Sequence, residues 1–258
     1  MIYSHINSKD NQLIKLVAKL AKNAEFRHEQ QKAVIYGRHL IEEALLANNL
    51  NCVLISEDSL NNYADIIDNL NSKQIYVIKN TLFNKFDIAD SHIDIVALIN
   101  FSEANMLDDI YGKDCILLEN IQDPGNLGAI LRVARAGNIQ NILLSKSCVD
   151  VYNPKVLRAS QGMQFGLNII TDVDLIAFAN KYNGNMIATN PRGESAIYQI
   201  DFTINTAMFF GNEGNGLTKE LLECIHNVRI PMLGNSESLN LAMSVTICVF
   251  EMVRQRCI

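Results

Sequence analysis

Signals for export or for insertion into a membrane are missing from this chain. Its first residues, MIYSHINSKDNQ, show no basic start followed by an apolar run, so no secretory signal is visible. The most apolar stretch, Leu239–Phe250, contains several polar residues and is too short to cross a bilayer, which takes about 20 apolar residues. We therefore expect a buried helix there, no association with a membrane and a cytoplasmic location.

Paired cysteines and metal-ligand patterns are missing as well. The six cysteines are scattered and form no C-x-x-C pair, which favours reduced, buried thiols over disulfides or metal ligands. The five histidines show neither H-E-x-x-H nor any other ligand spacing. The sequence therefore predicts a protein that needs no metal ion.

Positive charge is scarce overall but concentrated near the start of the chain. The net charge of −6 argues against nucleic acid as a partner, because phosphate binding needs lysine and arginine. Residues 1–40, however, hold seven Lys or Arg against three acids, a net +4 that leaves −10 for the remainder. This basic segment fits either an RNA-docking surface or an ordinary solvated helix face.

Short apolar strands alternate with helical patterns through the first hundred residues. Apolar residues at helical spacing predict a helix over 10–22. Strands separated by helical stretches are expected at 33–36, 51–56, 74–79 and 94–100. This rhythm favours an α/β domain. The stretch 101–114 is polar and lacks a pattern, so we place a domain boundary there, with one domain over 1–105 and another over 106–258.

The second domain repeats the alternation with more apolar strands. We expect strands at 115–119, 141–145, 185–189, 207–211 and 227–230, and helices at 127–136, 154–160, 217–224 and 239–254. Strands that are apolar throughout indicate a parallel sheet covered on both faces. Ligands of such sheets bind beyond the carboxyl ends of the strands.

Three polar segments follow those carboxyl ends. In the first, LLENIQDPGNLGAILRVARAG (117–137), Asn126 is a plausible N-cap for the helix, and Arg132 lies about two turns further on. The functional interpretation has Arg132 reaching back to the helix start. The alternative is an ordinary surface arginine.

The second segment, FFGNEGNGLT (209–218), places three glycines directly after a strand, which predicts a tight loop that approaches a ligand closely. Gly211 and Gly216 have the spacing of a phosphate-binding loop, but Leu217 stands where that motif needs lysine. The missing lysine argues against a nucleotide hydrolase. Glu213 either binds a ligand hydroxyl or holds the loop itself.

The third segment, IPMLGNSESLNLAMS (230–244), forms a turn and then starts the last helix, with Ser236 or Ser238 expected as its cap. Ser238 and Asn240 are polar groups at the mouth of an apolar helix. Leaving such groups buried without a partner costs about 1–3 kcal/mol, so we expect them to bond to the backbone, to each other or to a ligand.

Taken together, these segments resemble the SpoU (TrmH) family of RNA ribose methyltransferases, within the SPOUT superfamily. The resemblance rests on an ordered set: Asn126-Leu-Gly-Ala-Ile-Leu-Arg132, Asn153-Pro-Lys…Arg158-Ala-Ser, Gly211-Asn-Glu-Gly-Asn-Gly-Leu and Ile230-Pro-Met…Glu237-Ser-Leu-Asn240. It covers residues 115–258. Residues 30–100 are similar, more loosely, to the substrate-binding domain of many members. Asn168 stands where members often have proline, which leaves the substrate class open.

The resemblance implies a parallel-sheet domain with a trefoil knot and a homodimer that pairs through the helix near 239–254. It implies that S-adenosylmethionine binds in the knot, against Gly211, Ile230, Met232 and Leu239. It places Arg132 at the transferring methyl group, helped by Asn126, Glu213, Ser238 and Asn240. It also implies RNA as substrate, ribosomal RNA ahead of transfer RNA, because of the extra N-terminal domain.

The role of Arg132 follows from its chemistry. A guanidinium is always protonated in proteins and is therefore a poor base. We interpret Arg132 as gripping a neighbouring phosphate and stabilising negative charge that develops on the ribose oxygen. Three rival functions remain at this point: a non-catalytic RNA-binding or assembly protein, a nucleotide hydrolase, and a methyltransferase that modifies a base.

Overall fold

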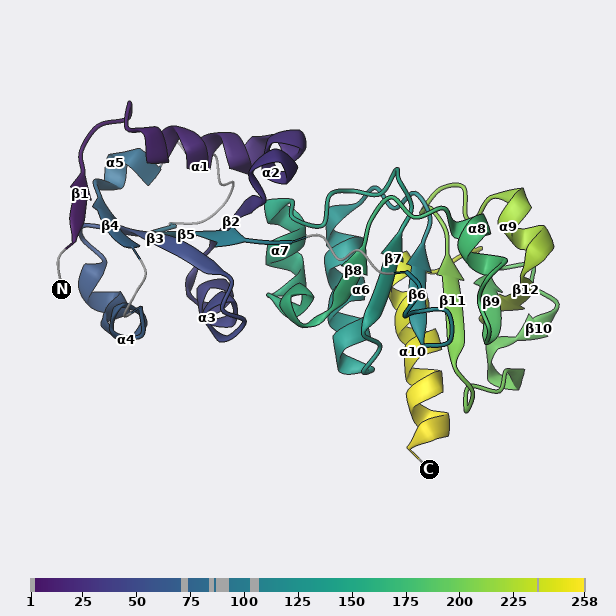
Figure 1. Cartoon of the computed structure of the whole chain (residues 1–258). Coiled ribbons are helices and arrows are strands. Elements are labelled where there is room, and N and C mark those ends of the chain that lie inside the picture. Colours follow the sequence, from purple (N-terminus) through teal and green to yellow (C-terminus); the bar gives the residue numbers. More distant parts are fainter. Residues whose placement is uncertain are drawn as a thin grey trace. The chain divides into compact units, whose positions relative to one another are not determined.

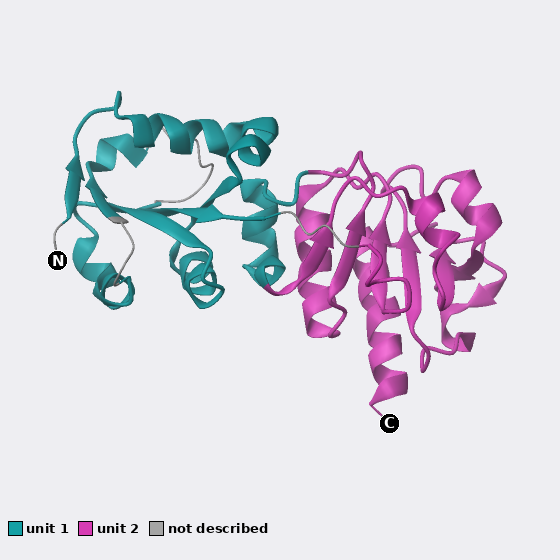
Figure 2. Ribbon diagram, in the orientation of Figure 1, with its two compact units in different colours: residues 1–102, 150–165 teal, residues 103–149, 166–258 magenta. Residues whose placement is uncertain are grey.

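The computed structural model describes residues 3–70, 74–83, 86, 93–102, 107–235 and 237–257. The chain forms two compact units (Figure 2). Unit 1 consists of residues 1–102 and 150–165, and unit 2 of residues 103–149 and 166–258. The sequence suggested one boundary between residues 105 and 106. In the structure the chain also returns to unit 1 at residues 150–165, between two strands of unit 2.

Unit 1 is built on a mixed five-stranded sheet with the order β1-β4-β3-β5-β2 (Figure 1). Its strands are β1 (Ser4–Ile6), β2 (Lys32–Tyr36), β3 (Leu50–Ser56), β4 (Gln74–Ile78) and β5 (Ile95–Asn100). β5 runs antiparallel to both of its neighbours, and the other pairs are parallel. The sequence predicted all of these strands except the three-residue edge strand β1.

Helices cover both faces of this sheet. They are α1 (Gln12–Lys22), α2 (Ala24–Gln30), α3 (Arg38–Leu46), α4 (Ala64–Asp68), α5 (Asn80–Phe83) and α7 (Pro154–Ser160), with a 3-10 turn at Leu60–Tyr63. Neighbouring strand residues point to opposite faces. Val34 therefore packs with Ile14 and Val17 of α1, whereas Ala33 and Ile35 pack with α3 and α4.

The segment 150–165 is held in unit 1 by packing and by a buried ion pair. Leu157 of α7 is fully buried in the apolar cluster beneath α3 and α4. Arg27, which is 2% exposed, donates through Nε to Asp150 at 2.6 Å and through Nη1 to the carbonyl of Leu20. Asn153 caps α7, which was expected at 154–160, and Pro154 occupies its first turn.

Unit 2 is built on a seven-stranded sheet with the order β10-β12-β9-β11-β6-β7-β8, in which every pair is parallel. The strands are β6 (Cys115–Leu118), β7 (Asn141–Leu144), β8 (Asn168–Ile170), β9 (Asn185–Thr189), β10 (Ser195–Ala196), β11 (Thr206–Phe210) and β12 (His226–Arg229). The predicted parallel sheet is confirmed. The two edge strands, β8 and β10, were missed because they have only three and two residues.

The helices of unit 2 are α6 (Pro124–Ala136), α8 (Leu175–Ala179), α9 (Lys219–Cys224) and α10 (Leu241–Arg256). Residues of α8 and α9 share an apolar cluster with one face of the sheet, and α6 and α10 pack side by side on the other (Figure 1). A Cβ on Gly137 would lie 2.2 Å from Val249 of α10, so glycine permits this close contact.

All six cysteines are free thiols. Cys52, Cys115 and Cys248 are buried, as expected, whereas Cys224 and Cys257 are exposed. Within the described part of the chain, no helix has the length and apolar character needed to cross a membrane. Nor do three His, Cys, Asp or Glu side chains among the described residues gather where they could hold a metal ion.

Candidate active site

The segments singled out in the sequence leave the sheet of unit 2 at one edge. β6 and β11 are parallel neighbours, with Leu118 opposite Phe210, so the segments that begin at Glu119 and Gly211 start side by side. β12 lies two strands away from β11, and Ile230 follows its last residue. The carboxyl edge of the sheet therefore brings together three segments that are far apart in the chain.

Helix α6 starts earlier than the sequence suggested. Asp123, rather than Asn126, is its N-cap, and the Asp123 carboxylate accepts a hydrogen bond from the backbone N–H of Asn126 at 2.7 Å. Pro124 fits the first turn because that turn needs no backbone donor from it. The expectation that Asn126 caps the helix was wrong, and its side chain is left for other contacts.

The Asn126 side chain connects all three segments. Its Nδ2 donates to Oε1 of Glu213 at 3.0 Å, and its Oδ1 accepts from Nδ2 of Asn240 at 2.9 Å. The backbone N–H of Asp123 also points to Oε1 of Glu213, at 3.4 Å. Three residues that the sequence selected separately thus form one hydrogen-bonded chain, in which Asn126 is half-buried and Glu213 and Asn240 are exposed.

The glycine-rich loop is tight, as predicted. The backbones of Asn212 and Gly216 exchange two hydrogen bonds, at 3.1 and 2.9 Å. Gly216 has φ +71°, which suits glycine, and a Cβ on Gly211 would lie 2.1 Å from the carbonyl carbon of Gly216. A larger residue at Gly211 would therefore clash with the loop backbone, whereas at Gly216 the space is open and the positive φ alone disfavours one.

Two contacts fasten this loop to the end of β6. Glu119 accepts hydrogen bonds from both the backbone N–H and the hydroxyl of Thr218, at 2.7 and 2.9 Å. Nδ2 of Asn212 donates to the carbonyl of Asn120 at 2.8 Å. From the sequence, Glu119 was expected only as the end of a strand. A carboxylate that directly follows an apolar strand and precedes a polar loop was the available signal for such a role.

The third segment runs from Ile230 to the start of α10. Asn240 is the N-cap of α10 and accepts from the backbone N–H of Met243 at 3.3 Å, so the expected caps Ser236 and Ser238 were wrong. Ser236 lies outside the described residues, and Ser238 is exposed two residues before the cap. Asn240 serves as cap through its Oδ1, which leaves its Nδ2 for Asn126.

Arg132 lies on the exposed side of α6, and its guanidinium makes no hydrogen bond or ion pair with any described residue. It lies six residues after Asn126, about 9 Å along the helix axis. Arg135, one turn further, donates instead to the carbonyl of Gly166 at 3.2 Å. Arg132 is therefore a cation available to an anion from outside the chain.

A thiol lies beneath the first segment but is not a nucleophile. Cys148 is half-buried, receives a hydrogen bond from the backbone N–H of Ile121 and donates to the carbonyl of Leu118, both at 3.3 Å. Burial raises the pKa of this thiol above its ordinary value, although nearby backbone and Ser145 contacts oppose the shift. The protonated form therefore dominates at neutral pH.

Comparison with known proteins places this geometry in a family. A model of the SpoU rRNA Methylase family matches residues 114–250, more than half of the chain. The chain belongs to this family. It is 31% identical over 260 residues to an uncharacterized tRNA/rRNA methyltransferase of Synechocystis sp., with 97% of this chain and 94% of the relative covered.

Two further similar proteins align along almost their whole length. The 23S rRNA (guanosine(2553)-2'-O)-methyltransferase RlmP of Bacillus subtilis is 28% identical over 251 residues, covering 96% of this chain and 98% of the relative. The SpoU methyltransferase AviRb from Streptomyces viridochromogenes, solved with AdoMet, superposes with a TM-score of 0.83 at 25% identity, covering 96% and 98%. The expected family and fold are confirmed.

The residues present fit the cofactor of such methyltransferases. S-adenosylmethionine offers an apolar adenine face together with polar groups that backbone atoms can bind. Leu233 and Leu239 are apolar yet 106% and 37% exposed, in a segment without helix or strand among its described residues. Ile230 and Met232 are half-buried beside them in the chain. Exposed apolar side chains next to a tight glycine loop suit a flat, partly apolar ligand.

Proposed function

We propose that this protein transfers a methyl group from S-adenosylmethionine to the ribose 2′-hydroxyl of an RNA nucleotide. The observation that carries the proposal is the link through Asn126, which joins Glu213 and Asn240 at the carboxyl edge of a parallel sheet. The unpaired Arg132 projects from the same helix. Membership of the SpoU family and the named activity of the Bacillus subtilis relative support the proposal.

Backbone and apolar groups bind the cofactor in this proposal. S-adenosylmethionine supplies an activated methyl group, so the protein has to position it and to make the ribose oxygen more reactive. Gly211 allows the loop backbone to come close to a ligand. Ile230, Met232 and Leu239 offer apolar contacts from the segment that follows β12. Holding two reactants in the right geometry supplies up to about 7–11 kcal/mol of the barrier.

Arg132 acts on the ribose oxygen and its surroundings. Its guanidinium stays protonated, so it serves as a fixed positive charge rather than as a base. We infer that it grips a phosphate next to the target ribose and stabilises the negative charge that grows on the 2′ oxygen. The proton leaves to a phosphate oxygen or to water. Asn126, Glu213, Ser238 and Asn240 position the segments around the reacting atoms.

Two copies of the chain form the working enzyme in this proposal. Met243 and Phe250 lie seven residues apart on α10, hence on one face of that helix, and are 61% and 47% exposed. Leu239, just before α10, adds a third exposed apolar side chain. Such a stripe suits an interface between copies, as the family resemblance implies. The trefoil knot and the division of labour between domains 1–105 and 106–258 are also part of the proposal.

Ribosomal RNA is the proposed substrate, and the cytoplasm the proposed location. RlmP of Bacillus subtilis, which aligns with 96% of this chain, is named for a 23S rRNA 2'-O-methylation. Transfer RNA stays as the second candidate, because the Synechocystis relative is named as a tRNA/rRNA methyltransferase. A non-catalytic role in RNA binding is less well supported, since Arg132, Glu213 and Asn240 are all present.

The test is transfer of labelled methyl groups from S-adenosylmethionine to total RNA, with the products identified by nucleoside mass spectrometry. We expect 2′-O-methylnucleosides from the unmodified protein. Arg132→Ala should lower turnover by about a hundred- to a thousand-fold, because it removes charge stabilisation in the transition state. Cofactor affinity, measured by calorimetry, should stay nearly unchanged.

Arg135→Ala is the matched control, since it removes a neighbouring exposed arginine of the same helix and should keep its turnover. Base-methylated products would show that the proposed reaction is wrong. Loss of cofactor binding together with activity in Arg132→Ala would show that the proposed role of Arg132 is wrong.

A further inference from the structure

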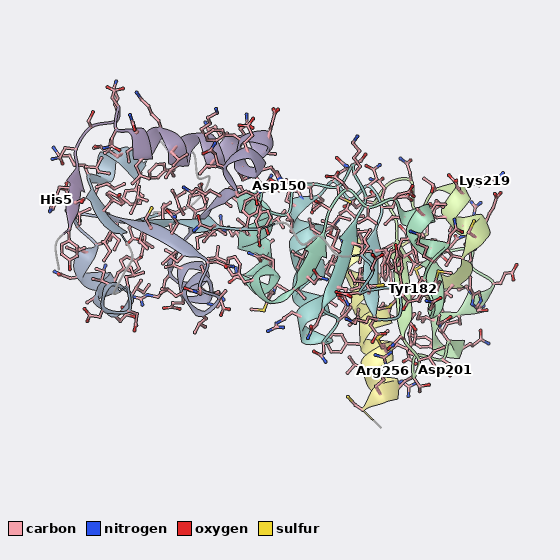
Figure 3. All side chains as sticks on the ribbon, viewed as in Figure 1. His5, Asp150, Tyr182, Asp201, Lys219 and Arg256 are labelled. Atoms are coloured by element: carbon pink, nitrogen blue, oxygen red, sulfur yellow. The ribbon has the colours of Figure 1, made fainter. Side chains whose placement is uncertain are left out.

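A cavity of about 490 Å³ opens at the free edge of the unit 1 sheet, far along the chain from the proposed active-site segments. It lies between the edge strand β1, the start of α1 and Tyr76 of β4. Figure 3 labels His5 on this strand. Ligand sites in proteins span roughly 300–1,000 Å³, so the cavity is large enough to hold a small molecular group.

The lining combines an apolar floor with a polar rim. Leu13, Leu16 and the half-buried ring of Tyr76 pack against the core beneath α1 and leave one side toward the cavity. The rim holds the imidazole of His5 and the amides of Asn11 and Gln12. Asn11 uses Oδ1 to cap α1 at 2.8 Å from the N–H of Leu13, which leaves its amide nitrogen as a donor at the rim.

Several lysines lie on or just before α1, the helix whose first residues line this cavity. α1 carries Lys15, Lys19 and Lys22 on its exposed side and contains no acid. Lys9 precedes it, with Asp10 as the nearby counter-charge at 3.5 Å from Lys15. Charges of both signs are mixed on the other face of the same sheet, where α3, α4 and α7 hold four acids against two arginines and one lysine. The chain as a whole is acidic, so this local concentration selects for an anionic partner.

We propose that the cavity binds one unpaired nucleotide of the RNA substrate, with Lys9, Lys15 and Lys19 on the phosphates beside it. This inference rests on the proposed function, because it takes RNA as the substrate. An unpaired base stacks on an aromatic ring and bonds through its edges to amide side chains, which are the groups that Tyr76, Asn11 and Gln12 provide. A paired base offers neither its face nor those edges, so the site selects a loop or a bulge.

The site would hold the RNA at a place distinct from the methyl-transfer site. The cavity would contribute to RNA affinity and to the choice of substrate, whereas methyl transfer would depend on the residues of unit 2. The expected signature is therefore a change in RNA affinity that leaves cofactor affinity unaltered.

The first test compares RNA binding by two double variants of the full-length protein. Fluorescence anisotropy with a labelled short single-stranded RNA gives the dissociation constant over a range of salt concentrations. Lys9→Gln with Lys15→Gln should weaken binding and lower the slope of log K against log salt by about 1.4, because two phosphate contacts are lost. Lys113→Gln with Lys181→Gln is the control. It removes the same charge from exposed sites just before strands β6 and β9 of unit 2, and it should leave the slope unchanged.

The second test addresses the base. Tyr76→Leu should weaken binding of the single strand by about five-fold or more, because a stacked base is lost, and should barely affect the same sequence in duplex form. Tyr76 is half-buried, so its replacement could disturb the fold. The cofactor affinity and the thermal unfolding of Tyr76→Leu are therefore measured as well, and both should match those of the unmodified protein. As a measurement that needs no variant, photocrosslinking of RNA containing 4-thiouridine should label peptides that contain residues 4–16 or Tyr76.

Unchanged RNA affinity and salt slope in Lys9→Gln with Lys15→Gln, or crosslinks confined to other peptides, would overturn the proposal. A failure of this proposal can be told apart from a failure of the proposed function. If the protein methylates RNA but these variants bind it normally, the cavity is not the site. If it binds RNA through the cavity and transfers no methyl group, the proposed function fails instead.

Discussion

At the scale of single residues, the side chain of Asn126 has the greatest consequence for the site. It donates to Glu213 and accepts from Asn240, so one amide holds together segments that are 87 and 114 residues away in the chain. An amide suits this place because it offers a donor and an acceptor at once. Neither alanine nor a carboxylate can make both bonds.

We predict that Asn126→Ala lowers kcat by roughly ten- to a hundred-fold, because a displacement of about 1 Å at a reacting centre costs that much. The bonds are exposed, so the loss of unfolding free energy should be only about 1 kcal/mol. Steady-state kinetics and urea unfolding measure the two effects. Gln140→Ala, an exposed polar substitution just after the same helix, is the control. A variant with normal turnover would mean that the link through Asn126 does not matter to the reaction.

Much of the site could be predicted from residue types in order. Asn126, Glu213 and Asn240 were singled out as polar groups at strand ends, and the structure brings them together. Which of them caps a helix could not be predicted, because Asp123 competes with Asn126, and Ser238 with Asn240, within a few residues. The role of Glu119 depends on Thr218, 99 residues away, and this pairing follows only from the register of β6 and β11.

At the scale of elements, the end of α10 is fixed by a network around Glu251. This carboxylate is 6% exposed and accepts hydrogen bonds from Arg254 at 2.7 and 2.8 Å and from Gln255 at 2.8 Å. Gln255 in turn binds the backbone of Ile200 and Phe202. The hydrogen bond from Arg254 is the main cause that lowers the pKa of Glu251 below its ordinary value, and burial opposes it.

A depressed carboxyl pKa adds stability that is present above the pKa of the unfolded chain and is lost as the pH falls through the folded value. We therefore predict that Glu251→Gln lowers the free energy of unfolding by about 1 kcal/mol at pH 7. The difference in unfolding free energy between the unmodified protein and Glu251→Gln should narrow as the pH falls below the usual carboxyl range. Urea unfolding over a pH series measures this.

Glu223→Gln is the control for that series. Glu223 forms an exposed pair with Lys219 on α9, with side chains 64% and 90% exposed, and such pairs contribute little (Figure 3 labels Lys219). If the difference in unfolding free energy for Glu251→Gln stays constant or widens toward acid pH, the hydrogen bonds assigned to Glu251 do not stabilise the fold as described.

The elements show where sequence patterns carry enough information and where they do not. Long apolar strands such as β3 and β11 were predicted to within one residue, because burial on both faces dictates their composition. β1, β8 and β10 were missed, since strands of two or three residues carry almost no pattern. The assignment of α7 to unit 1 was also missed. It depends on the Arg27–Asp150 pair and on the burial of Leu157, which join residues more than a hundred positions apart.

At the scale of the whole molecule, the chain crosses between its two units three times, after residues 102, 149 and 165. Unit 1 is therefore not a simple appendage at the start of the chain. One of the four family motifs, Asn153-Pro-Lys…Arg158, lies in unit 1, while the other three lie in unit 2. The family pattern is thus shared between both compact units.

The proposed pairing through α10 gives a prediction at the same scale. Met243→Glu with Phe250→Glu should convert a dimer to a monomer, because two apolar side chains that the proposed interface would bury are replaced by charges. Light scattering coupled to size exclusion measures the mass. Leu46→Glu, at an 82% exposed apolar position of α3, is the control and should leave the mass unchanged. An unmodified protein that is a monomer at all concentrations would exclude the pairing.

The central claim is that this chain methylates a ribose in RNA through Arg132. The most direct measurement is a map of 2′-O-methylation across ribosomal and transfer RNA from cells with and without the gene. We predict that at least one ribose methylation disappears without the gene, returns with the unmodified protein and does not return with Arg132→Ala. An unchanged map, the loss of base methylation alone, or full rescue by Arg132→Ala would contradict the account.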